Sequence, residues 1–276
     1  MELALGTRRY HLETKALVMG VLNRTPDSFY DRGAYFAFDD FLAWAERLVA
    51  DGADVLDVGG VKAGPGPEVT TDAELDRVVP AIEALRARFD VPISVDTWRA
   101  EVAREAFAAG AVLGNDISGF ADPGYLPAAV AAGASVVATH IRLQPRVPDP
   151  EPVYGDLVGE VLEFLSTRAE GARAVGIPPE RVVLDAGLDL GKTWLQSLEL
   201  LQATDRLSAL GYPVLLSASN KRFLGEVGHV GIDERRELSL AAAALGVAKG
   251  ARLVRAHDVA GTRRVCRSIA AVLEAR

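Results

Sequence analysis

The sequence predicts an α/β chain folded as a single closed (β/α)8 barrel (TIM barrel), and three observations lead to that prediction. Eight short apolar runs rich in Val, Leu and Ile alternate with stretches of helical periodicity. The chain has 276 residues, which suits eight such units in one barrel. Polar and ionisable residues recur at the same end of successive runs, where a barrel carries its functional groups. An open sheet with an extra lobe is the alternative architecture.

The eight apolar runs mark the predicted strands in chain order. They cover residues 16–23, 54–60, 92–98, 111–116, 135–140, 181–187, 213–219 and 251–258. Between them apolar residues recur at helical spacing, as in the segments that begin at Phe41, Glu74 and Asp156. Strands that alternate with helices form parallel βαβ units. Residues 1–15 lead into the first strand, and we expect residues 1–276 to form one domain because no linker interrupts the pattern.

Composition and charge disfavour several classes of protein. Hydrophobic residues make up 49% of the chain, and the net charge of −8 with a pI near 5.1 argues against nucleic acid or an anionic membrane as the main partner. The one cysteine, Cys266, can form no internal disulfide and suits a reducing compartment. The N-terminal residues lack the apolar stretch of a signal peptide, and no run approaches the roughly 18 residues of a membrane span. We therefore expect a cytoplasmic protein.

The last two strands supply a cluster of cations at the end where a barrel carries its active site. Arg255 and His257 are two residues apart, so an extended strand points both side chains to one face. Lys221 follows Ser219 at the end of the seventh strand. Barrels of this class often bind phosphate between the loops after these two strands, so we predict an anion site here. The alternative is that Arg255 pairs with Asp258 or another carboxylate of the barrel.

Hydrogen-bond acceptors end the strands across the mouth of the barrel. Asp96, Asn115 and Asp185 close the third, fourth and sixth strands. Together with Lys221 they could bind a flat heterocycle, by accepting from its N–H groups and donating to its carbonyl. The sequence therefore predicts a heterocycle site beside the anion site.

A divalent-metal cluster is the competing interpretation of these carboxylates. The hard oxygens for it would come from Asp54, Asp57, Asp96, Asp116 and Asp185. The cationic Lys221 would lie in the same site as these carboxylates, and the four histidines show no zinc-like spacing. A protein-built metal site is therefore disfavoured. A Mg²⁺ ion carried in with a phosphorylated substrate remains compatible with the sequence.

Three long loops follow predicted strands at this same end. They span residues 24–38, 61–71 and 141–154. Loops of more than ten residues in a compact barrel are more often functional than accidental. We therefore predict that they act as lids over the site.

Seven segments of the chain, in order, are similar to signature segments of the dihydropteroate synthase family. They read MGVLNRTPDSFYDRGAYF, DVLDVGG, SVDTWRAEVAREAFAAGA, NDISG, LDAGLDLGK, SNKRFLG and RAHDV. The resemblance runs from about Ala16 to the C-terminus. It implies a barrel enzyme of folate biosynthesis, a transferase that joins 6-hydroxymethyl-7,8-dihydropterin diphosphate to p-aminobenzoate and releases diphosphate. Sulfonamides compete for the p-aminobenzoate site of this family.

The resemblance also implies roles for individual residues. Pterin binding would fall to Asp96, Asn115, Asp185 and Lys221, diphosphate binding to Asn23, Arg255 and His257, and catalysis to Lys221, Arg255, His257 and Asn23. Asn23 would also help to ligate the Mg²⁺ that arrives with the diphosphate. The substrate's aromatic amine is the nucleophile, and preplaced donors stabilise the leaving diphosphate. A homodimer formed through the later helices is implied as well.

The lid after the second strand departs from the family pattern. Where the family reads GGESxRPG, with a hydroxyl residue at x, this chain reads GGVKAGPG, so Glu, the hydroxyl residue at x and Arg become Val61, Ala63 and Gly64. Losing one such donor commonly costs on the order of 100-fold in rate. Lys62 or Arg24 could compensate, although lysine is a poorer bidentate clamp than arginine.

The side of the site that would take p-aminobenzoate changes elsewhere too. Leu190 stands where the family often has an aromatic residue, Asn220 replaces an Arg, and His140 follows Thr139 rather than Met. The acceptor side and its lids would comprise Arg24, Phe29, Lys62, Gly64, Pro65, Leu190 and Ser219. The pterin half of the family pattern is thus kept, while the acceptor half is altered.

These sequence segments resemble those of a second-copy paralogue group of actinobacterial dihydropteroate synthases. Its members are generally regarded as poor or inactive in the standard reaction. Three hypotheses follow. The first is that the chain is a working synthase with unusual lids. The second is that it is a divergent paralogue that binds a pterin or its diphosphate and makes no dihydropteroate, either as a binding protein or as an enzyme that uses another acceptor. The third is a pterin-dependent methyltransferase, which is disfavoured because such enzymes need no diphosphate site.

Overall fold

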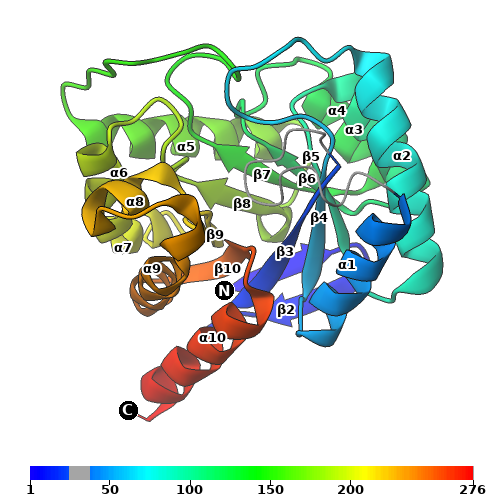
Figure 1. The fold of residues 1–276 in the computed structure, drawn as a ribbon. Coiled ribbons are helices and arrows are strands. Elements are labelled where there is room, and N and C mark those ends of the chain that lie inside the picture. Colours follow the sequence, from blue (N-terminus) through cyan, green and yellow to red (C-terminus); the bar gives the residue numbers. More distant parts are fainter. Residues whose placement is uncertain (25–37, 276) are drawn as a thin grey trace.

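The computed structural model describes residues 1–24 and 38–275, and within them eight parallel strands close into a barrel. The strand order is β3-β4-β5-β6-β7-β8-β9-β10, with β10 paired to β3. Figure 1 shows the helices arranged around these strands. The predicted (β/α)8 barrel is therefore confirmed, and the open sheet is wrong.

Each barrel strand lies inside one of the predicted apolar runs. The strands are β3 (Leu17–Asn23), β4 (Val55–Gly59), β5 (Ile93–Asp96), β6 (Leu113–Asp116), β7 (Ser135–Thr139), β8 (Val182–Asp185), β9 (Val214–Leu216) and β10 (Ala251–Ala256). Several runs extend past the end of their strand, because their last residues already belong to the loops at the mouth of the barrel.

The helices follow the strands and cover the outside of the barrel. They are α1 (Phe38–Ala50), α2 (Thr71–Arg88), α3 (Ala100–Ala109), α4 (Tyr125–Ala132), α5 (Leu157–Ala174), α6 (Trp194–Gln202), α7 (Thr204–Ser208), α8 (Arg222–Gly228), α9 (Arg236–Ala248) and α10 (Val259–Glu274), with short 3-10 turns at Pro179–Arg181 and Ile232–Glu234. Several begin at a side chain that accepts a backbone N–H, such as Thr70 for α2 and Asp156 for α5. In the described part of the chain, every helix is too short or too polar to cross a membrane.

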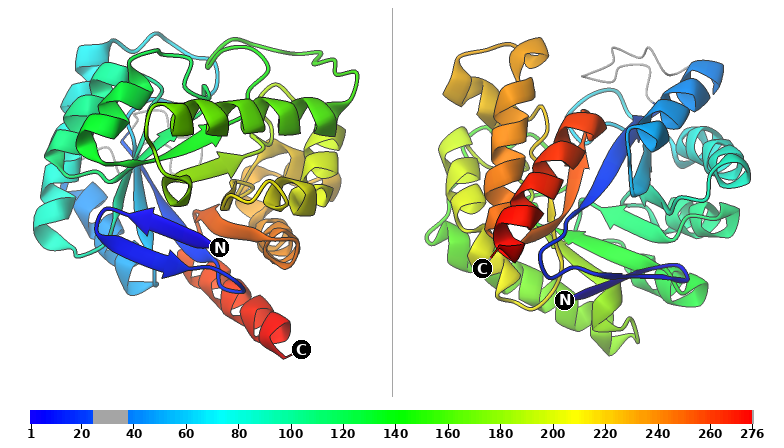
Figure 2. Two further views of the ribbon diagram at one scale, coloured as in Figure 1. Left: turned by 180° about the vertical axis from the view of Figure 1, so that it is seen from behind. Right: turned by 90° about the horizontal axis from the view of Figure 1, so that it is seen from below.

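The N-terminal residues form a hairpin that the sequence analysis did not predict. The strands β1 (Glu2–Leu5) and β2 (Arg8–His11) pair antiparallel around Gly6, which has a left-handed φ of 60°. Leu3, Leu5 and Leu12 are fully buried against the apolar interior of the barrel. Figure 2 shows the hairpin lying at the end of the barrel away from the loops that follow β4 and β7. The hairpin therefore plugs the N-terminal end.

Alternation along the strands places an apolar layer below a polar one. The barrel interior holds Met19, Val55, Leu113, Val137, Val183, Leu215 and Leu253. Successive strand residues point to opposite faces, so the residue two positions after each of these apolar residues also points inward. It lies one layer nearer the mouth of the barrel. At that position most of the strands carry a polar side chain.

Candidate active site

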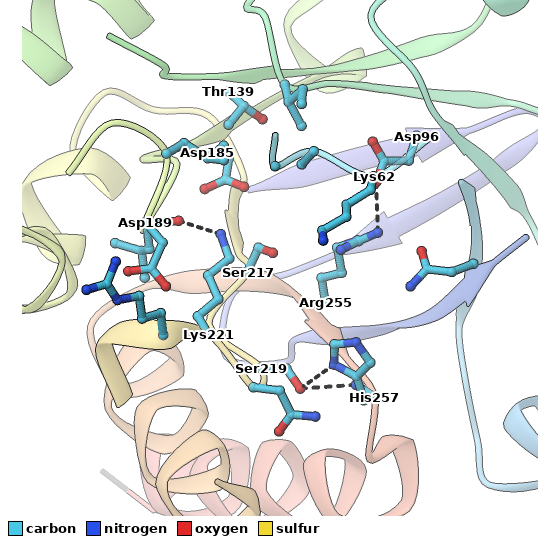
Figure 3. A pocket seen from close by; sticks show the side chains of 18 of the residues that line it. Lys62, Asp96, Thr139, Asp185, Asp189, Ser217, Ser219, Lys221, Arg255 and His257 are labelled. Carbon is cyan, nitrogen blue, oxygen red and sulfur yellow. Dashed lines mark hydrogen bonds and ion pairs between the residues drawn. The ribbon is translucent and has the colours of Figure 1, made fainter. Parts of the chain in front are cut away.

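The polar layer lies around the floor of a cavity at the carboxyl ends of the strands. One inward side chain from each strand, β4 to β10, supplies Asp57, Asp96, Asn115, Thr139, Asp185, Ser217 and Arg255, with Ser217 one residue past β9. The cavity has a volume of about 410 Å³ and is shown in Figure 3. A cavity of this size with convergent polar groups is typical of a small-molecule site.

Arg255 is the central cation of this layer and is paired with two carboxylates. Its Nε lies 2.6 Å from Asp57 Oδ2 and its Nη2 lies 2.9 Å from Asp96 Oδ2. The amide of Asn115 donates to the same Asp57 oxygen at 3.2 Å. The pairing with barrel carboxylates, which the sequence left open as an alternative, is present in the structure. Burial raises the pKa of Asp96 to about 7, although Arg255 acts in the opposite direction.

Asp185 and Lys221 face one another across the cavity (Figure 3). Asp185 Oδ1 accepts from the N–H of Gly187 at 2.8 Å, and Lys221 Nζ donates to the carbonyl of Leu188 at 2.5 Å. Burial raises the pKa of Asp185 and lowers the pKa of Lys221, while each charge partly offsets the shift of the other. Both side chains are therefore poorly solvated and suited to recognising a polar ligand.

His257 lies at the rim next to Ser219. The Oγ of Ser219 is 3.0 Å from His257 Nδ1 and also accepts from the backbone N–H of His257 at 3.2 Å. Burial, and then the charge of Arg255, lower the pKa of His257 to about 3. The imidazole is therefore neutral at pH 7. Arg255 and Lys62 also line the cavity and supply positive charge to its mouth.

The loop after β4 forms part of the cavity wall. Val61, Lys62 and Gly64 line the cavity, and Figure 3 shows Lys62 extending into it beside Arg255. Arg146, from the loop after β7, donates to the carbonyls of Lys62 at 3.4 Å and Pro67 at 2.5 Å. The two loops are thus tied together above the site.

The other predicted lid residues divide between two hollows. Leu190 and Ser219 line the main cavity, whereas Pro65 lines a neighbouring hollow of about 460 Å³ that also touches Leu190. Phe29 lies outside the described residues.

Arg24 is directed away from the cavity, toward the helices. Its guanidinium carbon lies 5.0 Å from the ring centroid of Phe38 and 5.6 Å from that of Phe41, and its Nη1 donates to the carbonyl of Arg77 at 3.1 Å. The suggestion that Arg24 replaces the family's lid arginine is therefore not supported by its position. Lys62 is the better placed of the two candidates.

Asn23 ends β3 and lines the cavity as the sequence analysis expects. Its amide oxygen lies 3.4 Å from the point where a Cβ on Gly59 would stand, so the glycine leaves room for it. Within residues 1–24 and 38–275, His, Cys, Asp and Glu form no group of three that could hold a metal ion.

Several site residues were missed by sequence reasoning. Asp57 was considered only as a metal ligand, and Thr139 and Ser217 were assigned no place in the site, although all three occupy the inward position of their strands. Lys192 was missed as well: its buried ammonium lies 2.9 Å from His140 Nδ1 and donates to the carbonyls of His140 and Leu190. The inward alternation of each strand was the signal that could have found the first three.

Residues 19–257 match the family model described as pterin binding enzyme. The chain is 48% identical to a Mycobacterium leprae protein named inactive dihydropteroate synthase 2, over 94% of this chain and 91% of that protein. It is 41% identical to the dihydropteroate synthase of Haemophilus influenzae, over 89% of this chain and 90% of that protein. A crystal structure of the Yersinia pestis dihydropteroate synthase in a sulfonamide drug complex superposes with a TM-score of 0.95 at 37% identity, covering 100% of both chains.

Proposed function

The chain belongs to the pterin-binding family of dihydropteroate synthases, and from that premise we propose that it condenses 6-hydroxymethyl-7,8-dihydropterin diphosphate with p-aminobenzoate. The observation that carries the proposal is the polar layer of the barrel. Acceptors from Asp96, Asn115 and Asp185 and cations from Lys221 and Arg255 converge on one cavity. A ligand with a polar heterocycle at one end and a polyanion at the other matches both sides of that layer.

The pterin ring is assigned to the side of the polar layer that carries Asp185 and Lys221. One carboxylate oxygen of Asp185 accepts from the backbone N–H of Gly187, and the second oxygen can accept from the ring N–H groups. One N–H of the Lys221 ammonium donates to the carbonyl of Leu188, and the other two can donate to a ring nitrogen or carbonyl. Asp185 is buried and Lys221 is half-buried, and burial disfavours the charged form of each, so a mismatch with the ligand is costly and the recognition is specific.

The diphosphate, with the Mg²⁺ that accompanies it as part of the substrate, is assigned to the opposite rim. Arg255 and Lys62 supply charge there, neutral His257 can donate a hydrogen bond, and the amide oxygen of Asn23 is a hard ligand suited to Mg²⁺. Arg255 is already paired with two carboxylates, so the diphosphate competes with them for the guanidinium. Burial holds the pKa of Asp96 near 7, so this carboxyl can be protonated at neutral pH. A neutral Asp96 binds the guanidinium of Arg255 less strongly, which favours the exchange for diphosphate.

The reaction needs no nucleophile from the protein. The C–O bond between the pterin methylene and the diphosphate breaks, and its electron pair leaves with the diphosphate. The amine nitrogen of p-aminobenzoate forms the new C–N bond, and its proton passes to water or to the departing diphosphate. The role of the chain is to hold the two substrates in line and to stabilise the charge that develops on the diphosphate.

The test is a condensation assay with the purified chain, 6-hydroxymethyl-7,8-dihydropterin diphosphate, Mg²⁺ and p-aminobenzoate. Dihydropteroate and diphosphate are both quantified. Equal formation of the two at enzymatic turnover is the expected result, and Asp185→Asn should abolish it. Diphosphate release without dihydropteroate would contradict p-aminobenzoate as the acceptor.

A second candidate function is pterin binding without this condensation. The altered lid favours it: Val61 is 5% exposed at a position where the family has Glu, and Gly64 presents no side chain to the cavity that it lines. The Mycobacterium leprae relative bears the name inactive dihydropteroate synthase 2. Tight pterin binding with no dihydropteroate in the assay would establish this candidate over the first.

Restoring the family's lid separates the two candidates further. A Cβ on Gly64 would meet only Lys62 Cε, at 3.7 Å, among the described atoms, so an arginine fits there without a clash at Cβ. Ala63→Thr with Gly64→Arg should raise any condensation rate on the order of 100-fold, because each restores a donor to the leaving group. A matched pair, Ala63→Val with Gly64→Leu, adds bulk without donors and should give no gain.

A further inference from the structure

Thr139 carries a buried hydroxyl for which the described chain provides no partner. The residue is 1% exposed, and Oγ1 has no hydrogen-bond partner in the structure. Leaving a buried hydroxyl unpaired destabilises a protein, so such groups in native structures call for an explanation. Asp185, Asn115 and Asp57, which belong to the same layer, each make at least one hydrogen bond.

The orientation of Thr139 turns this hydroxyl toward the cavity. Its methyl carbon Cγ2 faces the loop after β8, 3.2 Å from the point where a Cβ on Gly187 would stand. Figure 3 shows the hydroxyl oxygen on the cavity side of Thr139. Thr139 pairs with Asp185 in the β7–β8 register and lines the cavity. The hydroxyl therefore lies beside a group that the proposed function assigns to the pterin.

We propose that Thr139 is a specificity-determining residue whose hydroxyl hydrogen-bonds the bound heterocycle on the edge next to Asp185. This inference rests on the proposed pterin site and adds a contact to it. An ionised carboxylate can only accept and an ammonium can only donate, whereas a hydroxyl does either and can complete a mixed edge of ring N–H and nitrogen or carbonyl groups. The ligand supplies the partner that the protein lacks, so the unpaired hydroxyl is a cost that binding removes.

Thr139→Val tests this directly, because valine keeps the shape and removes the hydroxyl. Two effects of opposite sign are expected. The ligand-free variant should melt about 2–4 °C higher, since an unpaired buried hydroxyl is lost. Its affinity for 6-hydroxymethyl-7,8-dihydropterin, measured by calorimetric titration, should fall about 10-fold, since the ligand's polar edge loses its partner.

Thr139→Ser is the matched control. Serine keeps the hydroxyl and loses the methyl, so the affinity should stay within about 3-fold of the wild type while the melting temperature falls. A role in packing alone would give the reverse order, with serine the weaker binder and valine unchanged.

The outcomes distinguish this inference from the function on which it rests. If the wild type fails to bind the dihydropterin, the pterin assignment fails and the inference falls with it. If the wild type binds and Thr139→Val binds equally well, the pterin site stands and the inference alone is overturned. A Thr139→Val chain that melts lower than the wild type would also overturn it, because the hydroxyl would then have a stabilising partner in the ligand-free protein.

Discussion

Lys62 is the cationic side chain that the altered lid adds to the mouth of the cavity. Figure 3 shows it beside Arg255, and the carbonyl of its own backbone is held by Arg146. Lys62→Ala should therefore weaken the binding of inorganic diphosphate with Mg²⁺ about 10- to 100-fold, the scale of one hydrogen bond to a charged group. Binding of 6-hydroxymethyl-7,8-dihydropterin should not change, because the contacts proposed for the pterin lie with Asp185 and Lys221 on the other side of the cavity.

Two controls isolate the position of that charge. Lys15→Ala removes an exposed lysine outside the cavity and should leave diphosphate binding unaltered. Lys62→Arg should keep most of the affinity. Equal losses in Lys62→Ala and Lys15→Ala would mean that only net charge matters and that Lys62 has no place in the site.

At the scale of single residues, the sequence could predict charged groups at strand ends but not which hydroxyls matter. Asp96, Asp185 and Arg255 are conspicuous because burying a charge is costly, so their presence inside apolar runs signals a role. Thr139 and Ser217 look ordinary by the same criterion, because Thr and Ser are common in strands and loops. Only the closed barrel, which fixes the inward side of each strand, brings them into the site.

Among the elements, the loop after β8 depends on a glycine at its turn. Gly187 has a left-handed φ of 65°, and a Cβ there would lie 1.9 Å from the carbonyl oxygen of His140. Gly187→Ala should therefore lower the free energy of unfolding by more than about 2 kcal/mol and displace the Leu188 carbonyl that Lys221 binds. Urea denaturation and a dihydropterin titration would measure both effects.

Gly171 provides the matched control for that substitution. It lies within helix α5, and a Cβ there would meet nothing within 4 Å. Gly171→Ala should stabilise the protein by about 0.5–1 kcal/mol without altering binding, because alanine is the better helix former. Similar stabilities for the two variants would contradict the close approach of the β7 and β8 loops.

The same loop is fastened by the buried ammonium of Lys192. Burial, and then the charge of Lys221, lower the pKa of Lys192 from its ordinary value to about 7. Between about pH 7 and pH 10 the unfolded chain holds the lysine proton more tightly than the folded chain, so stability rises with pH in this window. The contribution is up to about 1.4 kcal/mol per pH unit for one proton.

Lys192→Met removes that titration and is the measurement for it. The free energies of unfolding of wild type and variant are compared in urea at pH 7, 8 and 9. The wild type should gain stability relative to the variant as the pH rises. A difference that stays constant across these pH values would show that Lys192 keeps its ordinary pKa in the fold.

At the scale of elements, the sequence predicted the barrel strands and the main helices but missed the N-terminal hairpin. The strands are recognisable because each is an isolated apolar run of Val, Leu and Ile. The segment around Leu3 and Leu5 is short, and arginines follow at Arg8 and Arg9, so nothing in it marks a strand. Its structure depends on the open end of the barrel, which exists only once the strands have closed.

In the whole molecule, the residues that stabilise the fold and the residues that would bind a ligand lie at opposite ends of the barrel. The hairpin and the apolar interior occupy the N-terminal end, and the polar layer with its lids occupies the other. This division is common in barrels of this class, since the strands connect the ends rigidly while the loops at one end remain variable. Substitutions at the two ends should therefore act on different measured quantities.

Leu5→Ala and Asp185→Asn test that separation together. Leu5 is 1% exposed in the plug, so its truncation should cost about 2–5 kcal/mol of unfolding free energy while leaving dihydropterin affinity unchanged. Asp185→Asn should abolish that affinity and alter stability by less than about 1 kcal/mol, because burial already disfavours the charged carboxylate that it replaces. Because the two residues lie at opposite ends of the barrel and share no partner, the double variant should show the sum of the stability changes.

Val272→Ala is the control for truncation itself, because Val272 is 65% exposed on α10 and should change stability by less than about 0.5 kcal/mol. Urea denaturation of all four variants gives the stabilities, and calorimetric titration gives the affinities. Loss of dihydropterin binding in Leu5→Ala at temperatures where it remains folded would mean that the plug sets the geometry of the polar layer. The ends of the barrel would then be coupled, since movement of the interior side chains of β3 and β10 would reach Asn23 and Arg255 along the same strands.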